Sequence, residues 1–300
     1  MPKKTKSPKI SDTKINLSPE NKKKYTMAAI CFVAIAVAIF FLFIFQRTPS
    51  GPKKSQVDGE LKDFSEITLK DRPYVTLTPT SDGAEIIVSL ENISYFDSIE
   101  YEITYNADNP QSPGDKIQRG ATGTDVNTKD QKYKKDILLG TASKGVKSPD
   151  RGITDGKLTL HLGKGDSQYL SETQWDLFEI GKQATTIKDQ TGNLNLDIPA
   201  TLGKTYWVIL ADTIGVPPTF DKDPQTVITP VYGAFSIAPK FSKSINLDLK
   251  LTKDSKSPSL NLYSPQEGKW ETKEPKYDQS TKTISTSLDN FATFVVTSSE

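Results

Sequence analysis

The stretch Ser98-Ile99-Glu100-Tyr101-Glu102-Ile103-Thr104-Tyr105 alternates large apolar side chains with charged or polar ones. A period of two residues places the aliphatic and aromatic side chains on one face of a strand and the glutamates on the other. The turn signals Asn109-Pro110 and Pro113-Gly114 follow and end the stretch. Burial of one face only is typical of antiparallel sheets. The stretch therefore predicts a half-buried strand in an antiparallel β protein.

The same alternation continues on both sides of this strand, from Pro73 to the end of the chain. No strong helical period of apolar residues appears after residue 72, and the stretch 140–156, rich in glycine, serine and lysine, indicates a long loop. We therefore predict a mainly β fold class, with two antiparallel β-sandwich units at residues 73–224 and 225–300. The expected strands are 74–78, 84–91, 99–105, 133–139, 157–162, 175–180, 206–211, 245–251, 260–263, 270–273, 283–288 and 291–297.

Before the β region, residues 26–45 read TMAAICFVAIAVAIFFLFIF and contain no charge, proline or glycine. As a helix this run is roughly 30 Å long, the thickness of a bilayer's hydrocarbon core. A backbone in lipid must pair its own polar groups, which a helix does. A cleaved signal peptide is the alternative, but the run is long for one and Gln46-Arg47-Thr48-Pro49 offers no A-x-A site. We predict one N-terminal transmembrane helix at 26–45.

Charge gives the orientation of this helix. Residues 1–25 carry eight lysines and two acidic residues, and the lysine-rich flank of a membrane helix stays in the cytoplasm. We expect residues 1–25 to be a disordered basic cytoplasmic tail, residues 46–72 to be a spacer, and the β units to lie outside the cell membrane. The tail lysines are expected to contact anionic lipid, or to act only as the topology signal.

The rest of the chain restricts the partners further. Since the whole chain has a net charge of +1, the part outside the basic tail is mildly acidic, which argues against a nucleic-acid partner. Cys31 is the only cysteine and lies inside the apolar run, so the β units contain no disulfide and depend on packing. This pattern favours a prokaryotic surface protein over a disulfide-rich secreted module.

The C-terminal segment shares an ordered set of features with a known family. They are Gly233-Ala234-Phe235-Ser236-Ile237-Ala238-Pro239, the alternating strand 245–251, Gly268-Lys269-Trp270, and Asn290-Phe291-Ala292-Thr293-Phe294. In these features residues 225–300 resemble the ZU5 domain and related C-terminal β modules of prokaryotic surface proteins. The resemblance implies a sandwich used for structure or interaction. Some relatives cut their own backbone at His-Phe-Ser; here the matching triplet is Asn290-Phe291-Ala292, which has neither nucleophile nor base, so we predict no self-cleavage.

Few residues in the sequence suggest a catalytic or metal-binding site. The only histidine, His161, is expected on the solvent face of its strand, and a lone histidine does not make a His-rich metal site. Asp212-Thr213-Ile214-Gly215 differs from the Asp-Thr-Gly of aspartic proteases by the inserted isoleucine, and no second copy supplies the paired carboxylate. Asp212, Asp221 and Asp223 are either solvated turn residues or the lining of a calcium site. We predict no catalytic, cofactor-binding or metal-binding residues, and no cofactor.

The predicted function is that of a membrane-anchored extracytoplasmic surface protein with a structural or binding role. Its expected partners are the lipid bilayer, through 26–45, and a surface protein or glycan. Trp175, Trp207 and Trp270 are expected to anchor the core, with a carbohydrate platform at one of them as the alternative. Two other functions stay open. One is an extracytoplasmic glycan hydrolase with a carboxylate pair among Glu172, Asp176 and Glu179, and the other is a subunit of an envelope assembly with an exposed apolar patch.

Overall fold

The computed structural model describes residues 59–200 and 204–298, and this part of the chain is mainly β, with antiparallel sheets and only short 3-10 helices. The mainly β prediction is therefore confirmed. The predicted tail 1–25, the helix 26–45 and the first part of the spacer lie outside the described residues. Within the ranges that the structure describes, no helix has the length and apolar character needed to cross a membrane.

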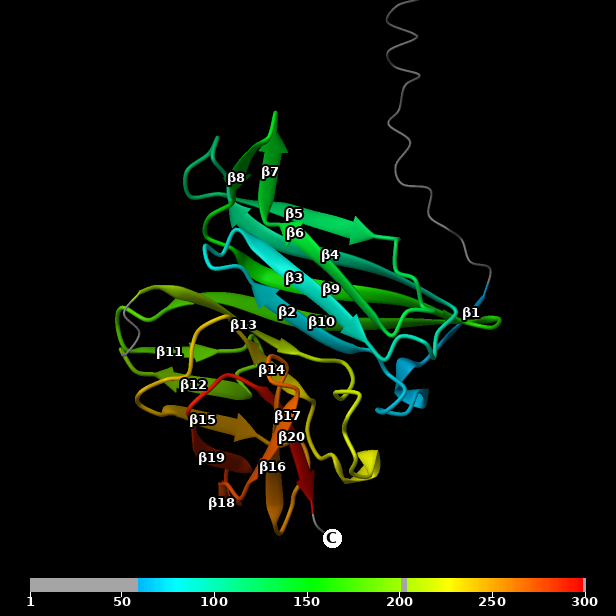
Figure 1. Cartoon of the computed structure of the whole chain (residues 1–300), viewed down its shortest axis with the longest axis vertical. Coiled ribbons are helices and arrows are strands. Elements are labelled where there is room, and N and C mark those ends of the chain that lie inside the picture. The colour runs from blue at the N-terminus through cyan, green and yellow to red at the C-terminus, as the bar shows by residue number, and fades with distance from the viewer. Residues whose placement is uncertain (1–58, 201–203, 299–300) are drawn as a thin grey trace, which may run out of the picture. The chain divides into compact units, whose positions relative to one another are not determined.

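The largest sheet has ten strands and runs through the whole described unit (Figure 1). Neighbouring strands on its main path are antiparallel, and β1 (Glu60–Lys62) pairs in parallel with β10 at the start of that strand. The order along the path is β17 (Lys269–Lys273), β16 (Pro258–Ser264), β20 (Thr293–Ser298), β14 (Tyr232–Phe235), β13 (Tyr206–Asp212), β10 (Ser167–Ile180), β9 (Thr154–Lys164), β4 (Ser98–Asp108) and β5 (Lys116–Gly123).

Two smaller sheets pack against this large sheet and enclose two cores. The first contains β2 (Tyr74–Pro79), β3 (Glu85–Glu91) and β6 (Lys132–Leu138), and its core includes Leu77, Val88 and Ile103. The second contains β11 (Thr185–Lys188), β12 (Leu194–Ile198), β15 (Ile245–Lys250), β19 (Thr283–Leu288) and β18 (Lys276–Asp278). Its core includes Leu196, Leu247 and Phe294. Face-to-face sheets over an apolar core are consistent with β-sandwich packing.

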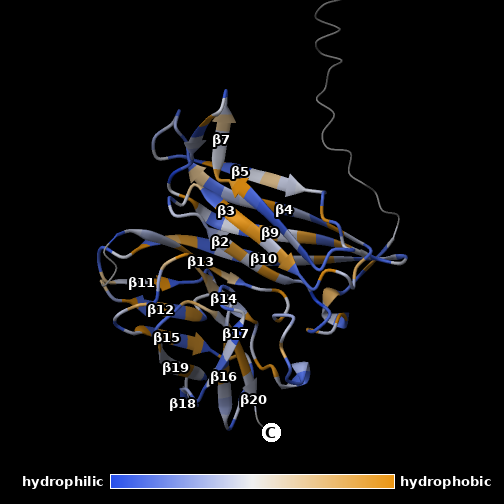
Figure 2. Ribbon diagram, in the orientation of Figure 1, coloured by the Kyte–Doolittle hydropathy of each residue, from blue (hydrophilic) through white to orange (hydrophobic). Residues whose placement is uncertain are grey.

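Alternating burial explains why these sequences form strands at a packed surface. Along β4, alternate residues from Ile99 to Ala107 are buried while the residues between them are exposed or partly exposed. Figure 2 shows the same alternation of hydrophobic and hydrophilic residues along neighbouring strands. Each strand predicted from the sequence overlaps a strand of the structure. The prediction at 98–105 is therefore confirmed with its face assignment.

Strand β13 belongs to both cores. Val208 and Leu210 lie in the second core, whereas Ile209 and Ala211 lie in the first. Because side chains of a strand alternate between its two faces, the two smaller sheets cover opposite faces of the large sheet at β13. The strand pairing also crosses the predicted division between residues 224 and 225, since β12 pairs with β15. The cores are thus joined through shared strands.

Residues 59–72 are not a free spacer, contrary to the prediction for this part of 46–72. After β1, Asp63 caps the 3-10 helix η1 (Phe64–Glu66), and Ile67 is buried in the first core. Arg72 then donates from Nε to the carbonyl oxygen of Ile67 at 2.9 Å, and its guanidinium lies 4.9 Å from the centroid of the Phe64 ring. These contacts fix the segment on the β unit.

The loop predicted at 140–156 is wrong for most of its length. Its first part forms the hairpin β7 (Gly140–Ser143) and β8 (Val146–Pro149), and β9 already begins at Thr154. The two residues between these strands, Lys144 and Gly145, have φ angles of 50° and 80°. Two positive φ angles are the requirement of a tight type I′ turn, whose twist matches that of paired strands. The glycine and lysine that suggested a loop therefore make the hairpin turn.

Candidate binding site

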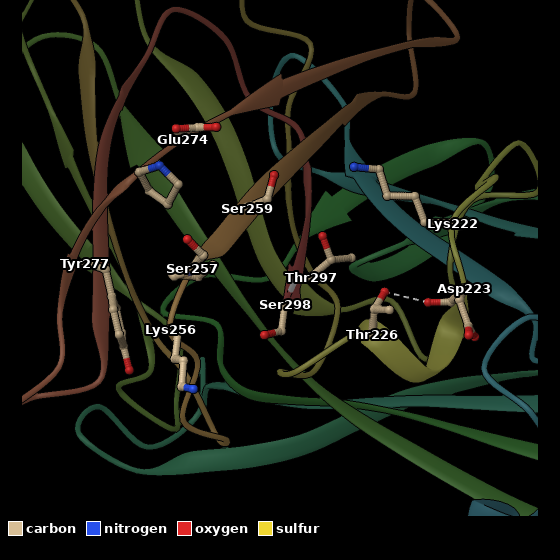
Figure 3. Close-up of a pocket in the computed structure, with 12 residues that line it drawn as sticks. Lys222, Asp223, Thr226, Lys256, Ser257, Ser259, Glu274, Tyr277, Thr297 and Ser298 are labelled. Carbon is tan, nitrogen blue, oxygen red and sulfur yellow. Dashed lines mark hydrogen bonds between the residues drawn. The ribbon is translucent and has the colours of Figure 1, made fainter. Parts of the chain in front are cut away.

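A polar cavity of about 540 Å³ lies at one end of the second pair of sheets. It is bordered by the first residues of β16, the last residues of β20, Tyr277 of β18, and the 3-10 helix η2 (Pro224–Thr226). Figure 3 shows Lys222 and Asp223 on one side of the cavity and Tyr277 with Lys256 on the other. Hydroxyl groups line the space between them, from Thr226, Ser257, Ser259, Thr297 and Ser298.

The charges around this polar cavity are balanced. Lys222 and Lys256 supply two positive charges, and Asp223 and Glu274 supply two negative ones. The Asp223 side chain accepts a hydrogen bond from the Gln225 backbone N–H at 2.9 Å and so caps η2. This capping fixes the loop that carries Lys222. A balanced set of donors and acceptors suits a neutral ligand with several hydroxyl groups better than a polyanion.

Buried hydrogen bonds hold the floor of the polar cavity. Asn261 is 1 % exposed, and its Nδ2 donates to Thr297 Oγ1 at 3.1 Å and to the Val295 carbonyl at 3.2 Å. Thr272 Oγ1 donates to the Asn261 side-chain oxygen at 3.0 Å. The hydroxyl of Tyr277 is covered and has no hydrogen-bond partner among the described residues.

The predicted carboxylate candidates for a hydrolase lie along β10, outside the polar cavity. Glu172 forms an ion pair with Lys157 at 3.0 Å, and Asp176 is half-buried, which raises its pKa to about 6. Glu172 and Asp176 share a face of the strand, but their backbones are about 13 Å apart at the usual strand rise. Glu179 has the opposite parity and faces the other way. Glycosidase carboxyl pairs are about 5–9.5 Å apart. The strand geometry thus gives no close pair.

Asp212 ends β13, and the residues after it form the expected turn. Its Oδ1 accepts a hydrogen bond from the Ile214 backbone N–H at 2.6 Å, and Ile214 has a positive φ of 66°. Burial raises the pKa of Asp212 to about 6, although the Ile214 N–H and nearby Arg72 act in the opposite direction. Across residues 59–200 and 204–298 no three His, Cys, Asp or Glu side chains are grouped to hold a metal ion. Asp212, Asp221 and Asp223 are therefore not brought together as a calcium site.

His161 and the triplet 290–292, both singled out from the sequence, have ordinary places in the β fold. His161 is exposed on β9, as its alternation predicts. The triplet Asn290-Phe291-Ala292 precedes β20 in a packed corner, where the Phe291 ring meets Phe241 edge-on at 5.2 Å. The Ala292 carbonyl accepts a hydrogen bond from the Ala234 N–H at 3.0 Å. The absence of self-cleavage stays a prediction.

The three tryptophans differ in burial. Trp175 is 1 % exposed and lies in the first core, which confirms the prediction for this residue. Trp270 is half-buried beside Phe220 and Tyr263, and its Nε1 donates to Thr219 at 2.9 Å. Trp207 is half-buried and lies outside the core clusters of the described residues. It is therefore not the core anchor that was predicted.

No known protein family and no curated protein matches this chain. The polar cavity was not predicted because its residues come from separate parts of the chain between 222 and 298, with no spacing that marks a motif. Its best sequence signal is the density of hydroxyl and lysine residues in 252–259. Such a composition is equally typical of a solvated turn.

Proposed function

We propose that this chain is a membrane-anchored extracytoplasmic surface protein with a structural or binding role. The single observation that carries the proposal is the uncharged run 26–45, preceded by eight lysines and followed by the β region. A run of this length crosses a bilayer as a helix, and the lysine-rich flank stays in the cytoplasm. The two sandwich-like layers then lie outside, with the C-terminal one as a ZU5-like module.

The β unit supports a binding role. The polar cavity is open, balanced in charge and held by buried hydrogen bonds below it, so its lining is in place before a ligand arrives. The most suitable partners for such a surface are a glycan or the polar surface of another protein. The basic tail adds contact with anionic lipid on the inner side of the membrane.

Membrane topology can be tested with single cysteines. We would replace Cys31 by serine and introduce Thr5→Cys in the tail or Lys144→Cys at the exposed hairpin turn. A membrane-impermeant maleimide is expected to label the Lys144→Cys chain on intact cells, and the Thr5→Cys chain only after lysis. The two variants serve as controls for each other.

The reverse labelling pattern would refute the proposed orientation. Labelling of both positions only after lysis, or recovery of the unlabelled chain in the soluble fraction, would refute the surface location itself.

A further inference from the structure

A second cleft lies beside Trp207 and does not involve the polar cavity described above. It has a volume of about 450 Å³ and is walled by the β2–β3 turn, the segment from Pro149 at the end of β8, and Leu177 near the end of β10. Its apolar surface comes from Trp207, Leu177 and Ile153, and its polar groups are Asp82, Asp150 and Arg151. We refer to it as the Trp207 cleft.

The position of Trp207 follows from strand parity. Trp207 has the same parity as Ile209 and Ala211, so its side chain leaves β13 on the face of the first core. It is the second residue of β13, precedes the core residue Ile209 on this face, and is half-buried. The Ser236 hydroxyl donates to the Trp207 carbonyl at 2.6 Å and fixes the backbone there.

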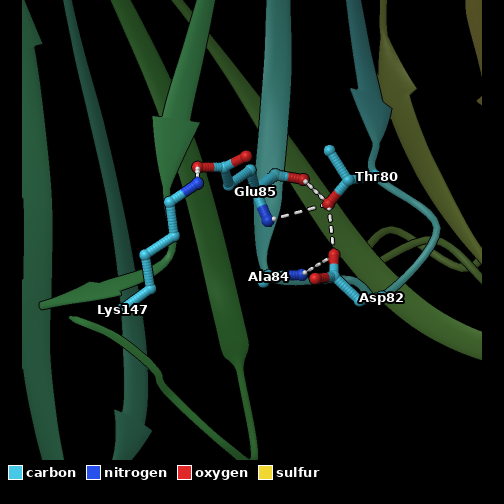
Figure 4. Close-up of polar contacts among 5 residues, drawn as sticks. All are labelled: Thr80, Asp82, Ala84, Glu85 and Lys147. Atoms are coloured by element: carbon cyan, nitrogen blue, oxygen red, sulfur yellow. Dashed lines mark hydrogen bonds and ion pairs between the residues drawn. The ribbon is translucent and has the colours of Figure 1, made fainter. Parts of the chain in front are cut away.

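The turn between β2 and β3 is shaped to receive this ring. A Cβ atom at Gly83 would lie 2.5 Å from Trp207 Cδ2, so only glycine allows the ring to lie against the backbone, and Gly83 has a φ of 69°. Figure 4 shows the hydrogen bonds that hold the turn. Thr80 Oγ1 donates to Asp82 Oδ1 at 2.7 Å, and that same oxygen accepts the Ala84 N–H at 3.1 Å.

The opposite wall of the cleft is also fixed. The Asp150 N–H donates to the Leu139 carbonyl at 2.9 Å, and the Asp108 N–H donates to the Arg151 carbonyl at 2.8 Å. Tyr105 donates its hydroxyl to Asp150 Oδ2 at 2.9 Å. Arg119 Nε lies 3.5 Å from the same carboxylate oxygen. The exposed Arg151 lines the cleft. The cleft thus combines rigid walls with a donor group that is available to a ligand.

We propose that the Trp207 cleft binds a pyranose unit of a glycan. The C–H face of a pyranose is apolar and suits an aromatic ring, while its hydroxyls need both an acceptor and a donor at the rim. Asp82 supplies the acceptor and Arg151 supplies the donor.

Titration of the full-length chain in detergent micelles tests the proposal and does not depend on membrane orientation. The probes are cellohexaose, chitohexaose and maltohexaose, measured by calorimetry. We expect at least one of them to bind with a Kd of about 1 mM or tighter. Trp207→Ala is expected to weaken that binding by about tenfold or more, and Trp207→Phe by less.

Trp270→Ala is the matched control, because it removes the other half-buried tryptophan from outside the cleft. It is expected to change the Kd by less than about twofold. Arg151→Gln, which keeps the backbone contacts of the wall, is expected to weaken binding by at least about threefold. The proposal is overturned if none of the three oligosaccharides binds, or if Trp207→Ala binds as tightly as the unmodified chain.

Discussion

Replacing Asp212 by asparagine should change how the stability of the β unit depends on pH. Burial raises the pKa of this carboxyl from its ordinary value of 3.8 to about 6. In the unfolded chain it titrates near the ordinary value, so the folded state binds more protons between these two pH values. The free energy of unfolding from this group is therefore larger at low pH and falls as the pH rises through 6.

The magnitude follows from the two pKa values. With a folded pKa of about 6, the Asp212 carboxyl makes the unit about 1.3 kcal/mol less stable at pH 7 than at pH 5. Asparagine cannot ionise, and its side-chain oxygen can still accept the hydrogen bond of the Ile214 N–H. The variant should lose this part of the pH dependence and gain up to about 3 kcal/mol at pH 7, the full value of the pKa difference.

The assay is urea unfolding of the full-length chain in detergent, followed by tryptophan fluorescence at pH 5, 6 and 7. Asp176→Asn is the matched control, because burial raises the pKa of Asp176 to about 6 as well. Each single variant should remove only the contribution of its own carboxyl to the pH dependence of the free energy of unfolding. The double variant should show the weakest pH dependence. The reasoning is refuted if Asp212→Asn keeps the full slope, or if the variant is less stable than the unmodified chain at pH 7.

Four further outcomes are expected. Trp175→Ala should lower the free energy of unfolding by about 3–5 kcal/mol because the indole is 1 % exposed in the first core. Lys147→Ala should leave the free energy of unfolding nearly unchanged because its ion pair with Glu85 is exposed to solvent; urea unfolding measures both. Deleting residues 26–45 should move the chain from the membrane pellet to the soluble fraction, as immunoblotting after ultracentrifugation would show; continued sedimentation with the membrane would contradict the anchor. Mass spectrometry of the purified chain should give the intact mass, whereas a fragment ending at Phe291 would show self-cleavage.

Much of the fold could be predicted because half-buried strands carry their own signal. The alternation of Ile99, Tyr101, Ile103 and Tyr105 gave both the strand and its buried face, and Ile245 to Leu249 did the same in the second sheet. The prediction succeeds where one face of the strand packs and the other is solvated, because the polarity of each residue then indicates the face on which it lies.

Other strands could not be predicted for identifiable reasons. Strand β5 reads KIQRGATG, lies at the sheet edge and is largely exposed, so its sequence shows no clear alternation of apolar and polar residues. Strands β11 and β12 are short and separated by the turn at Gln190-Thr191-Gly192. The partial burial of Trp207 could not be predicted from the sequence either, because it depends on where the first core ends and on the contact with Gly83.

The shared strands restrict how a C-terminal module can be defined in this chain. Within the described unit the second core is closed by β11 and β12 on one side and by Val208 and Leu210 of β13 on the other, all of which precede residue 225. A segment that began at residue 225 would leave that core open and would expose the β12-facing edge of β15. A ZU5-like module would therefore have to begin near Thr185. Since β13 also carries Ile209 and Ala211 of the first core, even that module would share a strand with the layers before it, and the two cores should unfold together.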